Sequence, residues 1–492
     1  MSEQKVRVRV TRNVMHLPTV ALRGLVVFPN NVVHFEVGRQ KSIAAIDAAM
    51  HANSSIFLIA QKEMDTEEPS VKDLYAYGVI AEIKQVLRVS EDLVKVLVEG
   101  KSRAKLLELD ACVSFWLKNG MDKEFGGVYT CLDRYGKVYS TDKSVWMQGR
   151  CGWIFAYLCH VYGVKQEWLE ASKSCLDFME KYCINRHAGD RMYFTVTKDG
   201  KPLRQRRYFY SEAFYALANA EYYGVTGDTA CLERARKACD IYWNLWHGMP
   251  DPTGMGPKTI PETRTGRSFG LPMIFLNVLS VMMRVDEEKK ALYEERAQTC
   301  VDEIFKYNYH PELKCVLENV GPNGEANLEY TEGRIVNPGH DIEGVWFMLE
   351  HAKRTGNKQL VADAEQIFNW AINAGWDKEY GGLLYFIDCL GNPPEAYEHD
   401  MKLWWPHDEI LIASLMLYRD TGKEEYLDWY FKTLEYSQKH FSDPEYGEWY
   451  GYLRRDGLPT MPSTKGSTFK GPFHLPRMLI MTDIMLGQLL ER

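Results

Sequence analysis

The sequence predicts a mainly helical chain: an (α/α)6 toroid over about residues 113–490, preceded by a small α+β lobe over about residues 10–108. Three observations support this prediction. A hairpin motif recurs through the second region, paired helical patterns lie between its copies, and all 13 tryptophans lie from Trp116 onward. The change of composition near residue 110 indicates two independently cored units.

The first region contains short apolar runs separated by turn residues. Candidate strands lie at residues 19–22, 25–28, 55–59, 78–83 and 93–98, and one helix is expected at residues 42–51. Several short strands with a single helix between them predict an α+β lobe.

The second region is organised by its repeated hairpin. Asp-Lys-Glu-Phe-Gly-Gly at residue 122 recurs as Asp-Lys-Glu-Tyr-Gly-Gly at residue 377 and as Asp-Pro-Glu-Tyr-Gly-Glu at residue 443. Weaker turn-rich stretches begin at residues 190, 249 and 310, so the six starts are about 60 to 68 residues apart. Paired helical patterns lie at residues 211–223 and 229–246, 340–355 and 358–374, and 408–421 and 424–440, with a last helix at 475–488. Six such units predict inner helices around a central pocket, and strong copies at both ends favour a closed ring over the alternative, an open solenoid.

Composition limits the classes of partner. A net charge of −8 argues against a nucleic-acid surface, and no apolar run approaches the ~18 residues of a membrane span. The first ten residues contain no apolar core of a signal peptide. Eleven scattered cysteines without a Cys-x-x-Cys motif indicate reduced thiols and argue against structural zinc. We therefore expect a cytoplasmic enzyme with a small polar substrate and no nucleic-acid or membrane partner.

Two histidines stand at predicted helix starts. His340 follows an Asn-Pro-Gly turn, and Glu343, three residues later, shares its helix face. His474 follows Lys-Gly-Pro-Phe, and Arg477 lies three residues later. A helix N-terminus disfavours a charged imidazole, so we expect a neutral His340 that accepts a proton. A lone histidine is more often a core residue, but two in such settings suggest proton transfer from two sides.

Other polar residues precede the inner helices. Trp404 and its neighbour Trp405 open one helix and could stack on a sugar ring, although adjacent tryptophans are usually core. His407 and Glu409 follow in the same stretch and could bind hydroxyl groups. Arg150, in Trp-Met-Gln-Gly-Arg, is expected to be a buried, paired cation.

The reaction is expected to need no cofactor and no metal. The sequence contains no phosphate-binding glycine loop and no His-Glu-x-x-His motif. An inverting glycosidase with two carboxylates, drawn from Glu212, Glu343 and Glu409, is the alternative in a similar toroid. The paired histidines favour proton abstraction beside a carbonyl instead.

Residues 113–490 resemble the N-acylglucosamine 2-epimerase family, also called renin-binding protein. The motifs that resemble it are, in order, Trp-x-Gln-Gly-Arg150, Tyr-Ser-Glu212, Asn-Pro-Gly-His340, Trp-Trp-Pro-His407-x-Glu409, Asp-Pro-Glu-Tyr-Gly-Glu-Trp-Tyr-Gly-Tyr452 and Phe-His474-x-Pro-Arg477. The resemblance implies an (α/α)6 barrel that interconverts N-acetylglucosamine and N-acetylmannosamine. It also implies activation by ATP without its consumption, and a homodimer.

The resemblance also implies a mechanism and its residues. The sugar ring opens, one histidine removes the C2 proton, and the second reprotonates the other face of the enediolate. The matching catalytic positions are His340 and His474. The substrate-binding or polarising positions are Arg150, Glu343, Glu409 and Arg477, to which we add His407 and Trp404.

Cellobiose 2-epimerases and mannose isomerases are the nearest relatives of that family. Cellobiose epimerases carry a further histidine in a Lys-His-x-Tyr-x-Gln-Ala-Phe motif. The corresponding stretch here begins Arg207-Tyr208, so Tyr208 replaces that histidine and the N-acylglucosamine branch is preferred. A cellobiose-epimerase or mannose-isomerase activity is one alternative.

Residues 17–107 resemble a different family, the N-terminal substrate-recognition domain of Lon protease. The matching stretches begin at Leu17, Val37, Ala60 and Val94. This resemblance implies a lobe that binds unfolded or partner protein, without Lon's ATPase and protease parts. Because the join comes early for the epimerase, residues 103–112 are expected to replace part of its first helix. A catalytically impaired fusion that acts as a binding protein is the other alternative.

Overall fold

The computed structural model describes residues 17–27, 32–51, 54–63, 65–67, 69, 73–75, 77–90, 93–105, 108–443 and 445–490. The chain divides into two compact units, Met1–Ala111 and Cys112–Arg492, each of which is considered by itself. The first ten residues, tested above for a signal peptide, lie outside the described part. Within it, none of the helices combines the length and apolar character needed to cross a membrane.

Unit 1 is a five-stranded sheet with one helix. Its strands follow the order β1-β3-β4-β5-β2, with β1 parallel to β3 and the other pairs antiparallel. Its elements are β1 (Thr19–Leu22), β2 (Val32–Val37), α1 (Gln40–His51), β3 (Ser55–Ala60), β4 (Tyr77–Ser90) and β5 (Leu93–Lys105). Isoleucine, valine and leucine from α1 and the strands form one buried core. The predicted α+β lobe is confirmed.

Two local predictions in unit 1 were wrong. Residues 25–27, the described part of the strand expected at 25–28, form no strand: Val27 packs into the core while Val26 stays exposed. The edge strand β2 was also missed, although its apolar residues Val33, Phe35 and Val37 alternate with exposed polar residues as in a half-buried strand.

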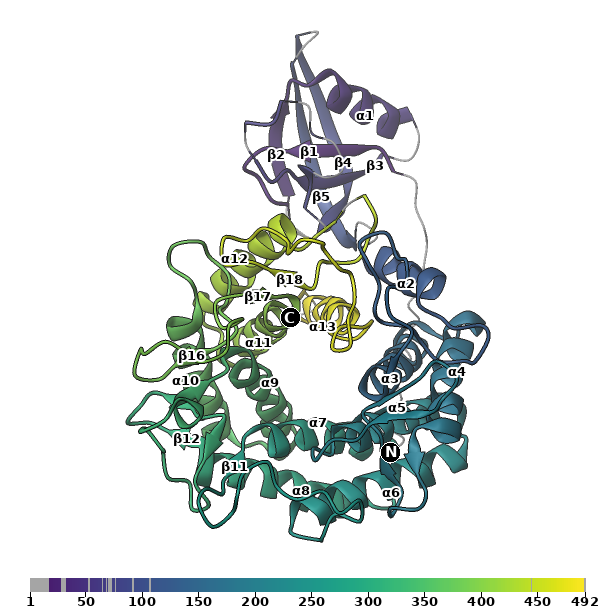
Figure 1. Cartoon of the computed structure of the whole chain (residues 1–492). Helices are drawn as coiled ribbons and strands as arrows, with labels where there is room; N and C mark the ends of the chain where they lie inside the picture. The colour runs from purple at the N-terminus through teal and green to yellow at the C-terminus, as the bar shows by residue number, and fades with distance from the viewer. Residues whose placement is uncertain are drawn as a thin grey trace, which may run out of the picture. The chain divides into compact units, whose positions relative to one another are not determined.

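Unit 2 is a closed ring of helices (Figure 1). In its described residues six inner helices pack each on the next, and the last also packs on the first. They are α3 (Val145–Tyr162), α5 (Tyr210–Thr226), α7 (Gly270–Val285), α9 (Pro338–Thr355), α11 (Trp404–Thr421) and α13 (His474–Leu490). The outer helices are α4 (Gln166–Tyr182), α6 (Thr229–Trp246), α8 (Lys290–Glu303), α10 (Lys358–Gly375) and α12 (Glu425–His440), and α2 (Glu108–Asn119) precedes the first inner helix. The predicted toroid is confirmed, and the open solenoid is wrong.

The start of the ring differs in detail from its expectation. Residues 103–105 finish the strand β5, and the helix α2 begins at Glu108, so only the second half of the expected segment 103–112 is helical. On α2, Trp116 Nε1 and Cys112 Sγ donate to Glu448 Oε2, at 2.6 and 2.8 Å. These two bonds join the first helix of unit 2 to its last hairpin.

Inner helices bury more of their side chains than outer helices do, as their positions in the ring predict. In α11, every residue from Trp404 to Leu417 is buried, because the helix is covered by both ring neighbours and by α12. Outer helices such as α4 bury only one face. The helices α5, α9 and α11 each end at a glycine in the left-handed region, Gly227, Gly356 and Gly422, with φ of 74°, 69° and 74°.

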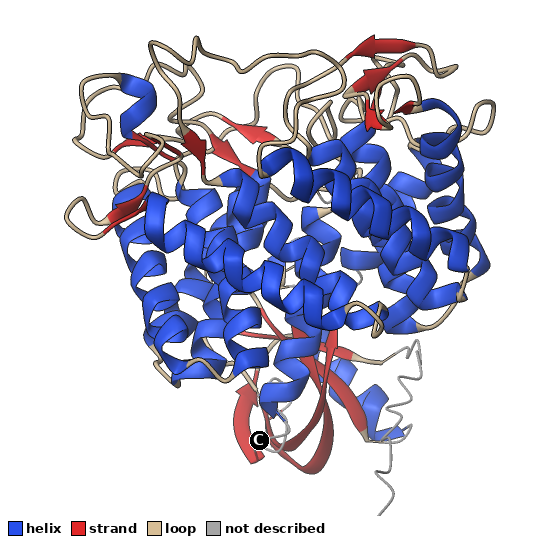
Figure 2. Cartoon of the chain, turned by 90° about the horizontal axis from the view of Figure 1, so that it is seen from below, coloured by secondary structure: helices blue, strands red, loops and turns tan. Residues whose placement is uncertain are grey.

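The hairpins and long loops of unit 2 gather at one end of the helices (Figure 2). There, the short strands before α3, α7, α9 and α11 each pair with a strand of the next hairpin along the chain. The pairs are β6 (Lys143–Ser144) with β9 (Thr195–Val196), β11 (Arg267–Ser268) with β14 (Asn319–Val320), β15 (Ile335–Val336) with β16 (Ile387–Asp388), and β17 (Lys402–Leu403) with β18 (Tyr452–Leu453). These pairs fix the N-terminal ends of inner helices at the loop end of the ring.

Candidate active site

The inner helices repeat a two-position pattern near their starts. The first position binds a backbone N–H of a hairpin: Gln148 Oε1 accepts from Val128 at 2.8 Å, and Glu212 Oε1 accepts from Met192 at 2.9 Å. His407 Nε2 accepts from Leu383 at 3.0 Å in the same way.

The second position lies two residues later on each helix. Two residues turn a helix by about 200°, so a side chain there points away from the hairpin and toward the middle of the ring. This position is occupied by Arg150 on α3, Phe214 on α5 and Glu409 on α11. Glu343 on α9 likewise follows the buried Asp341 by two residues. The rotation of the helix therefore distinguishes three predicted site residues, Arg150, Glu343 and Glu409, from the structural residues two positions before them.

His407 does not have the predicted role of binding hydroxyl groups. It is fully buried; its Nδ1 lies 2.7 Å from the carbonyl oxygen of Leu403, and its Nε2 holds the Leu383 N–H. Burial lowers the pKa of His407 to about 3, so the ring is neutral. Because both ring nitrogens serve the backbone, His407 supports the hairpin as Gln148 does, and that site prediction was wrong.

Glu212 is likewise a structural residue. Its Oε1 accepts from Arg191 Nε at 2.7 Å, and both side chains are 1% exposed. This buried ion pair removes Glu212 from the carboxylates that a glycosidase would need.

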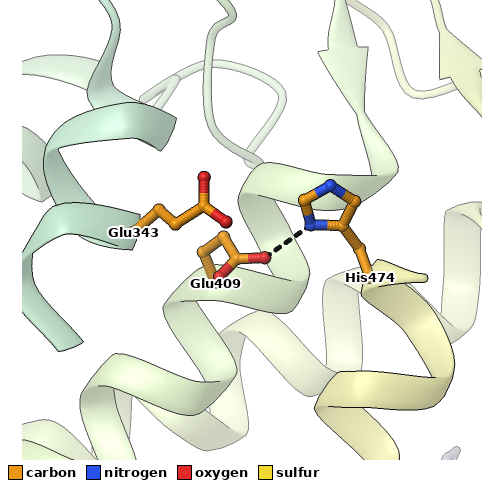
Figure 3. Close-up of side chains that lie close together, drawn as sticks. All are labelled: Glu343, Glu409 and His474. Carbon is orange, nitrogen blue, oxygen red and sulfur yellow. Dashed lines mark hydrogen bonds and ion pairs between the residues drawn. The ribbon is translucent and has the colours of Figure 1, made fainter. Parts of the chain in front are cut away.

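Glu343, Glu409, His474 and Arg477 form one buried cluster. Arg477 Nη2 donates to Glu343 Oε1 at 2.9 Å and to Glu409 Oε1 at 2.5 Å. His474 Nδ1 lies 2.8 Å from the same Glu409 oxygen (Figure 3). The second Glu409 oxygen accepts from Trp346 Nε1 at 2.6 Å. The helices α9, α11 and α13 therefore meet through a network of hydrogen bonds and ion pairs between side chains that are at most 10% exposed.

The environment of His474 keeps it neutral. Burial, followed by the positive charges of Arg477 and Arg150, lowers the pKa of His474 well below its usual value. When Nδ1 donates its proton to Glu409, the lone pair lies on Nε2; Arg477 Nη2 also lies 3.1 Å from Nδ1. In Figure 3 the Nε2 atom points away from Glu343 and Glu409. His474 can therefore accept a proton at neutral pH.

His340 has the opposite preference. It lies in the first turn of α9, where its backbone N–H donates to Asn337 Oδ1 at 3.2 Å, and its Nδ1 contacts Glu318 Oε1. Burial alone would lower the pKa of His340, but the charge and hydrogen bond of Glu318 outweigh burial and raise it. The carboxylate of Glu318, from a distant loop, therefore favours the charged form of His340, which is opposite to the effect expected from the helix terminus.

The indole of Trp405 lies against both histidines. Its ring centroid is 5.2 Å from that of His340 and 5.8 Å from that of His474. Trp404, the predicted substrate residue, is 2% exposed and meets His474 edge-on at 6.0 Å. No described residue pairs with the buried Trp404 Nε1.

Sequence reasoning selected Trp404 rather than its neighbour Trp405 as a substrate residue, and it missed Glu318. A sequence signal existed for Trp405, because it follows Lys402 by three residues, just as Trp146 follows Lys143. Both lysines form buried ion pairs with the aspartate of the repeated hairpin; for Lys402 the partner is Asp377, at 2.8 Å. No such signal existed for Glu318.

Arg150 is a cation without a carboxylate partner. Its guanidinium lies 4.3 Å from the ring centroid of Phe214 and 5.0 Å from that of Phe473. Among the described residues it has no hydrogen-bond acceptor, and its Nε is buried. Burial lowers the pKa of Arg150 to about 10, so it stays charged at neutral pH. This departs from the expected pairing and leaves the guanidinium free to meet an oxyanion.

A metal ion fits this site poorly. Atoms of Glu343, Glu409 and His474 that could bind a metal all lie within 4.8 Å of one another. However, the Arg477 guanidinium already donates to both carboxylates. A divalent cation would have to displace or repel that charge.

Comparisons with known proteins show the family and the fold of this chain. The family model described as N-acylglucosamine 2-epimerase (GlcNAc 2-epimerase) matches residues 127–470. The N-acylglucosamine 2-epimerase of Mus musculus is 37% identical over 390 residues, which cover 78% of this chain and 91% of that protein. The cellobiose 2-epimerase structure of Spirochaeta thermophila aligns with a TM-score of 0.67 at 21% identity, over 78% of this chain and 96% of that one, which shows the shared fold.

The class of protein is therefore a sugar epimerase, an isomerase. More particularly, the chain belongs to the N-acylglucosamine 2-epimerase family. Its N-terminal part matches the model for the substrate-binding domain of the ATP-dependent protease La (LON) over residues 16–144. The Lon protease of Clostridium acetobutylicum is 53% identical over 90 residues, which cover 18% of this chain and 12% of the protease.

Proposed function

We propose that unit 2 interconverts N-acetyl-D-glucosamine and N-acetyl-D-mannosamine by moving the C2 proton between two histidines, without a cofactor. The observation that supports this most is the pair His340 and His474: both lie against Trp405, and their pKa values are displaced in opposite directions. One is set as an acid and the other as a base. The substrate follows from the curated relative named above.

The proposed reaction acts on the open-chain sugar, in which C2 lies beside the C1 carbonyl. Neutral His474 takes the C2 proton through Nε2, and the electron pair of the C–H bond moves toward the carbonyl oxygen to form an enediolate. Protonated His340 then donates its proton to the opposite face of C2. Afterwards His474 is charged and His340 is neutral, so the reverse reaction begins from that state, or a proton must return before the next turnover.

The remaining residues bind the sugar and stabilise charge. Arg150 provides an unpaired cation for the developing enediolate oxygen, a preorganised charge of the kind that stabilises oxyanions. Arg477 holds Glu343 and Glu409 in place and completes the charge balance. Trp404 offers a buried N–H at the same site.

A disaccharide epimerase or mannose isomerase is the second candidate. Tyr208 stands where cellobiose epimerases have a histidine; it is 39% exposed and stacks on Tyr210 with ring centroids 5.7 Å apart. Tyr208 provides no imidazole at this position, which favours the monosaccharide. An impaired fusion is disfavoured, because α2 bonds to Glu448 and completes the ring.

Further properties belong to the same proposal. We propose domains at 10–108 and 113–490, a cytoplasmic location, a homodimer, ATP as an allosteric activator, and a Lon-like lobe that binds unfolded or partner protein. Their support is the resemblance of each unit to its family.

The direct test is an epimerisation assay in D2O. Purified chain incubated with N-acetyl-D-glucosamine should form N-acetyl-D-mannosamine carrying deuterium at C2, with cellobiose as the competing substrate. Absence of the product under conditions where the protein is folded would refute the proposed function.

A further inference from the structure

Glu318 lies at the loop end of the ring, where its backbone is hydrogen-bonded on both sides. It stands between β13 (Cys315–Val316) and β14 (Asn319–Val320), the strand that pairs with β11. Its N–H donates to the carbonyl oxygen of Ile335 at 3.1 Å, and its own carbonyl oxygen accepts from Phe269 N at 3.0 Å. Phe269 leads into α7 and Ile335 leads toward α9, so the backbone of Glu318 is fixed between two inner helices.

The side chain of Glu318 is directed by this backbone onto His340. Its carboxylate is 13% exposed and contacts Nδ1 of the imidazole. Among the described residues, no lysine or arginine forms an ion pair with Glu318. Its charge is therefore not shared with a permanent cation, whereas Glu409, the partner of His474, also binds Arg477.

The other contacts of His340 complete an oriented ring. Asn337 holds its backbone N–H, and the Trp405 indole lies 5.2 Å from the imidazole centroid. With Nδ1 committed to Glu318, only Nε2 remains for substrate, and it has no hydrogen-bond partner in the described part of the chain. A carboxylate that fixes the distal nitrogen of a histidine sets both the tautomer and the direction of its reactive nitrogen.

We infer that Glu318 is the positioning residue of His340: it holds the proton on Nδ1, aims Nε2 at C2 of the sugar and stabilises the imidazolium that donates the proton. This inference rests on the proposed role of His340 as the proton donor. It also explains why the two histidines that lie against Trp405 differ: the carboxylate beside His474 is shared with an arginine, and the carboxylate beside His340 is not.

The test is Glu318→Gln, which preserves the shape and a hydrogen-bond acceptor but removes the charge. We expect kcat for N-acetyl-D-glucosamine to fall between about 10- and 100-fold with a smaller change in KM, as is typical of residues that orient a functional group. Because the reaction in this direction needs protonated His340, activity declines as pH rises through the pKa of His340. That decline should occur at lower pH in Glu318→Gln.

A matched control lies on the same hairpin. Glu312 Oε1 is 2.8 Å from His310 Nδ1, but Glu312 is 63% exposed. Glu312→Gln also removes a carboxylate from a histidine, and it should leave kcat and the pH profile unchanged.

A second measurement does not depend on the substrate. In protein labelled at the histidine Cε1 carbons, the signal of His340 is the one that His340→Ala removes, and its titration midpoint should fall by about one to three pH units in Glu318→Gln. An unchanged midpoint would overturn the inference, whatever the effect on stability. If wild-type protein fails to epimerise hexosamines, the proposed function falls, and this midpoint alone still decides the role of Glu318.

Discussion

Replacing Arg477 by methionine removes the cation that joins Glu343 to Glu409. Arg477 is 2% exposed and donates to both carboxylates, which are 10% and 0% exposed. The methionine approximates the volume of the side chain but leaves two buried negative charges facing each other. Removing one partner of a buried ion pair typically costs about 3–5 kcal/mol. We expect Arg477→Met to lower the free energy of unfolding of unit 2 by about that amount.

Urea denaturation at pH 7, followed by circular dichroism of the helices, measures this loss. Arg454→Met is the control, because the Arg454–Asp456 pair is 56% and 39% exposed and such surface pairs contribute about 0–1 kcal/mol. The pKa of His474 should also rise, since Arg477 is one of the charges that lower it after burial itself. If Arg477→Met remained within about 1 kcal/mol of wild type, the carboxylates would not be held as a buried charged network and the reasoning would fail.

Three further predictions follow from the site and the domain division. Free N-acetylhexosamines should have a far higher kcat/KM than cellobiose, because Tyr208 replaces a histidine; comparable values would count against this. Activity should survive dialysis against a chelator, and ATP should change rate or stability without being hydrolysed; loss of activity that a divalent ion restores would contradict the role given to Arg477. A chain that starts near residue 101 should retain catalysis, whereas one that starts near residue 116 should have a lower Tm, because it loses the part of α2 that precedes the buried Trp116; loss of catalysis by a folded 101 chain would mean that the lobe belongs to the active site.

Where a helix of unit 2 was predicted by its residue range, that range lies close to the observed helix, whereas no range was predicted for α3, α4, α7 and α8. The pattern at residues 229–246 coincides with α6, and the pattern at 358–374 differs from α10 by one residue. These helices are long and amphipathic, so their periodicity is a strong signal. The two-residue strands at the loop end could not be predicted, since most of them pair with strands of other hairpins that are distant in the sequence.

The candidate site could be predicted in part. The sequence identified Arg150, Glu343, Glu409 and Arg477, but it could not separate Glu409, which binds His474 and Arg477, from His407, two residues earlier, because both share one motif. That distinction depends on which side of α11 faces the hairpin. Glu318 was missed since it lies 22 residues before His340 in an irregular loop, where no periodicity indicates the direction of a side chain.

The roles of the two histidines can be tested separately by exchange at C2. Each of His340→Ala and His474→Ala should lose epimerisation by at least about 10²- to 10⁴-fold, the usual cost of removing a general acid or base. Incubated in D2O with N-acetyl-D-glucosamine, His340→Ala should still exchange the C2 proton for deuterium, because His474 remains to abstract and return it on one face. His474→Ala should exchange the C2 proton of N-acetyl-D-mannosamine instead. Near-normal epimerisation by either variant, or exchange of both epimers by one of them, would contradict the two-histidine mechanism.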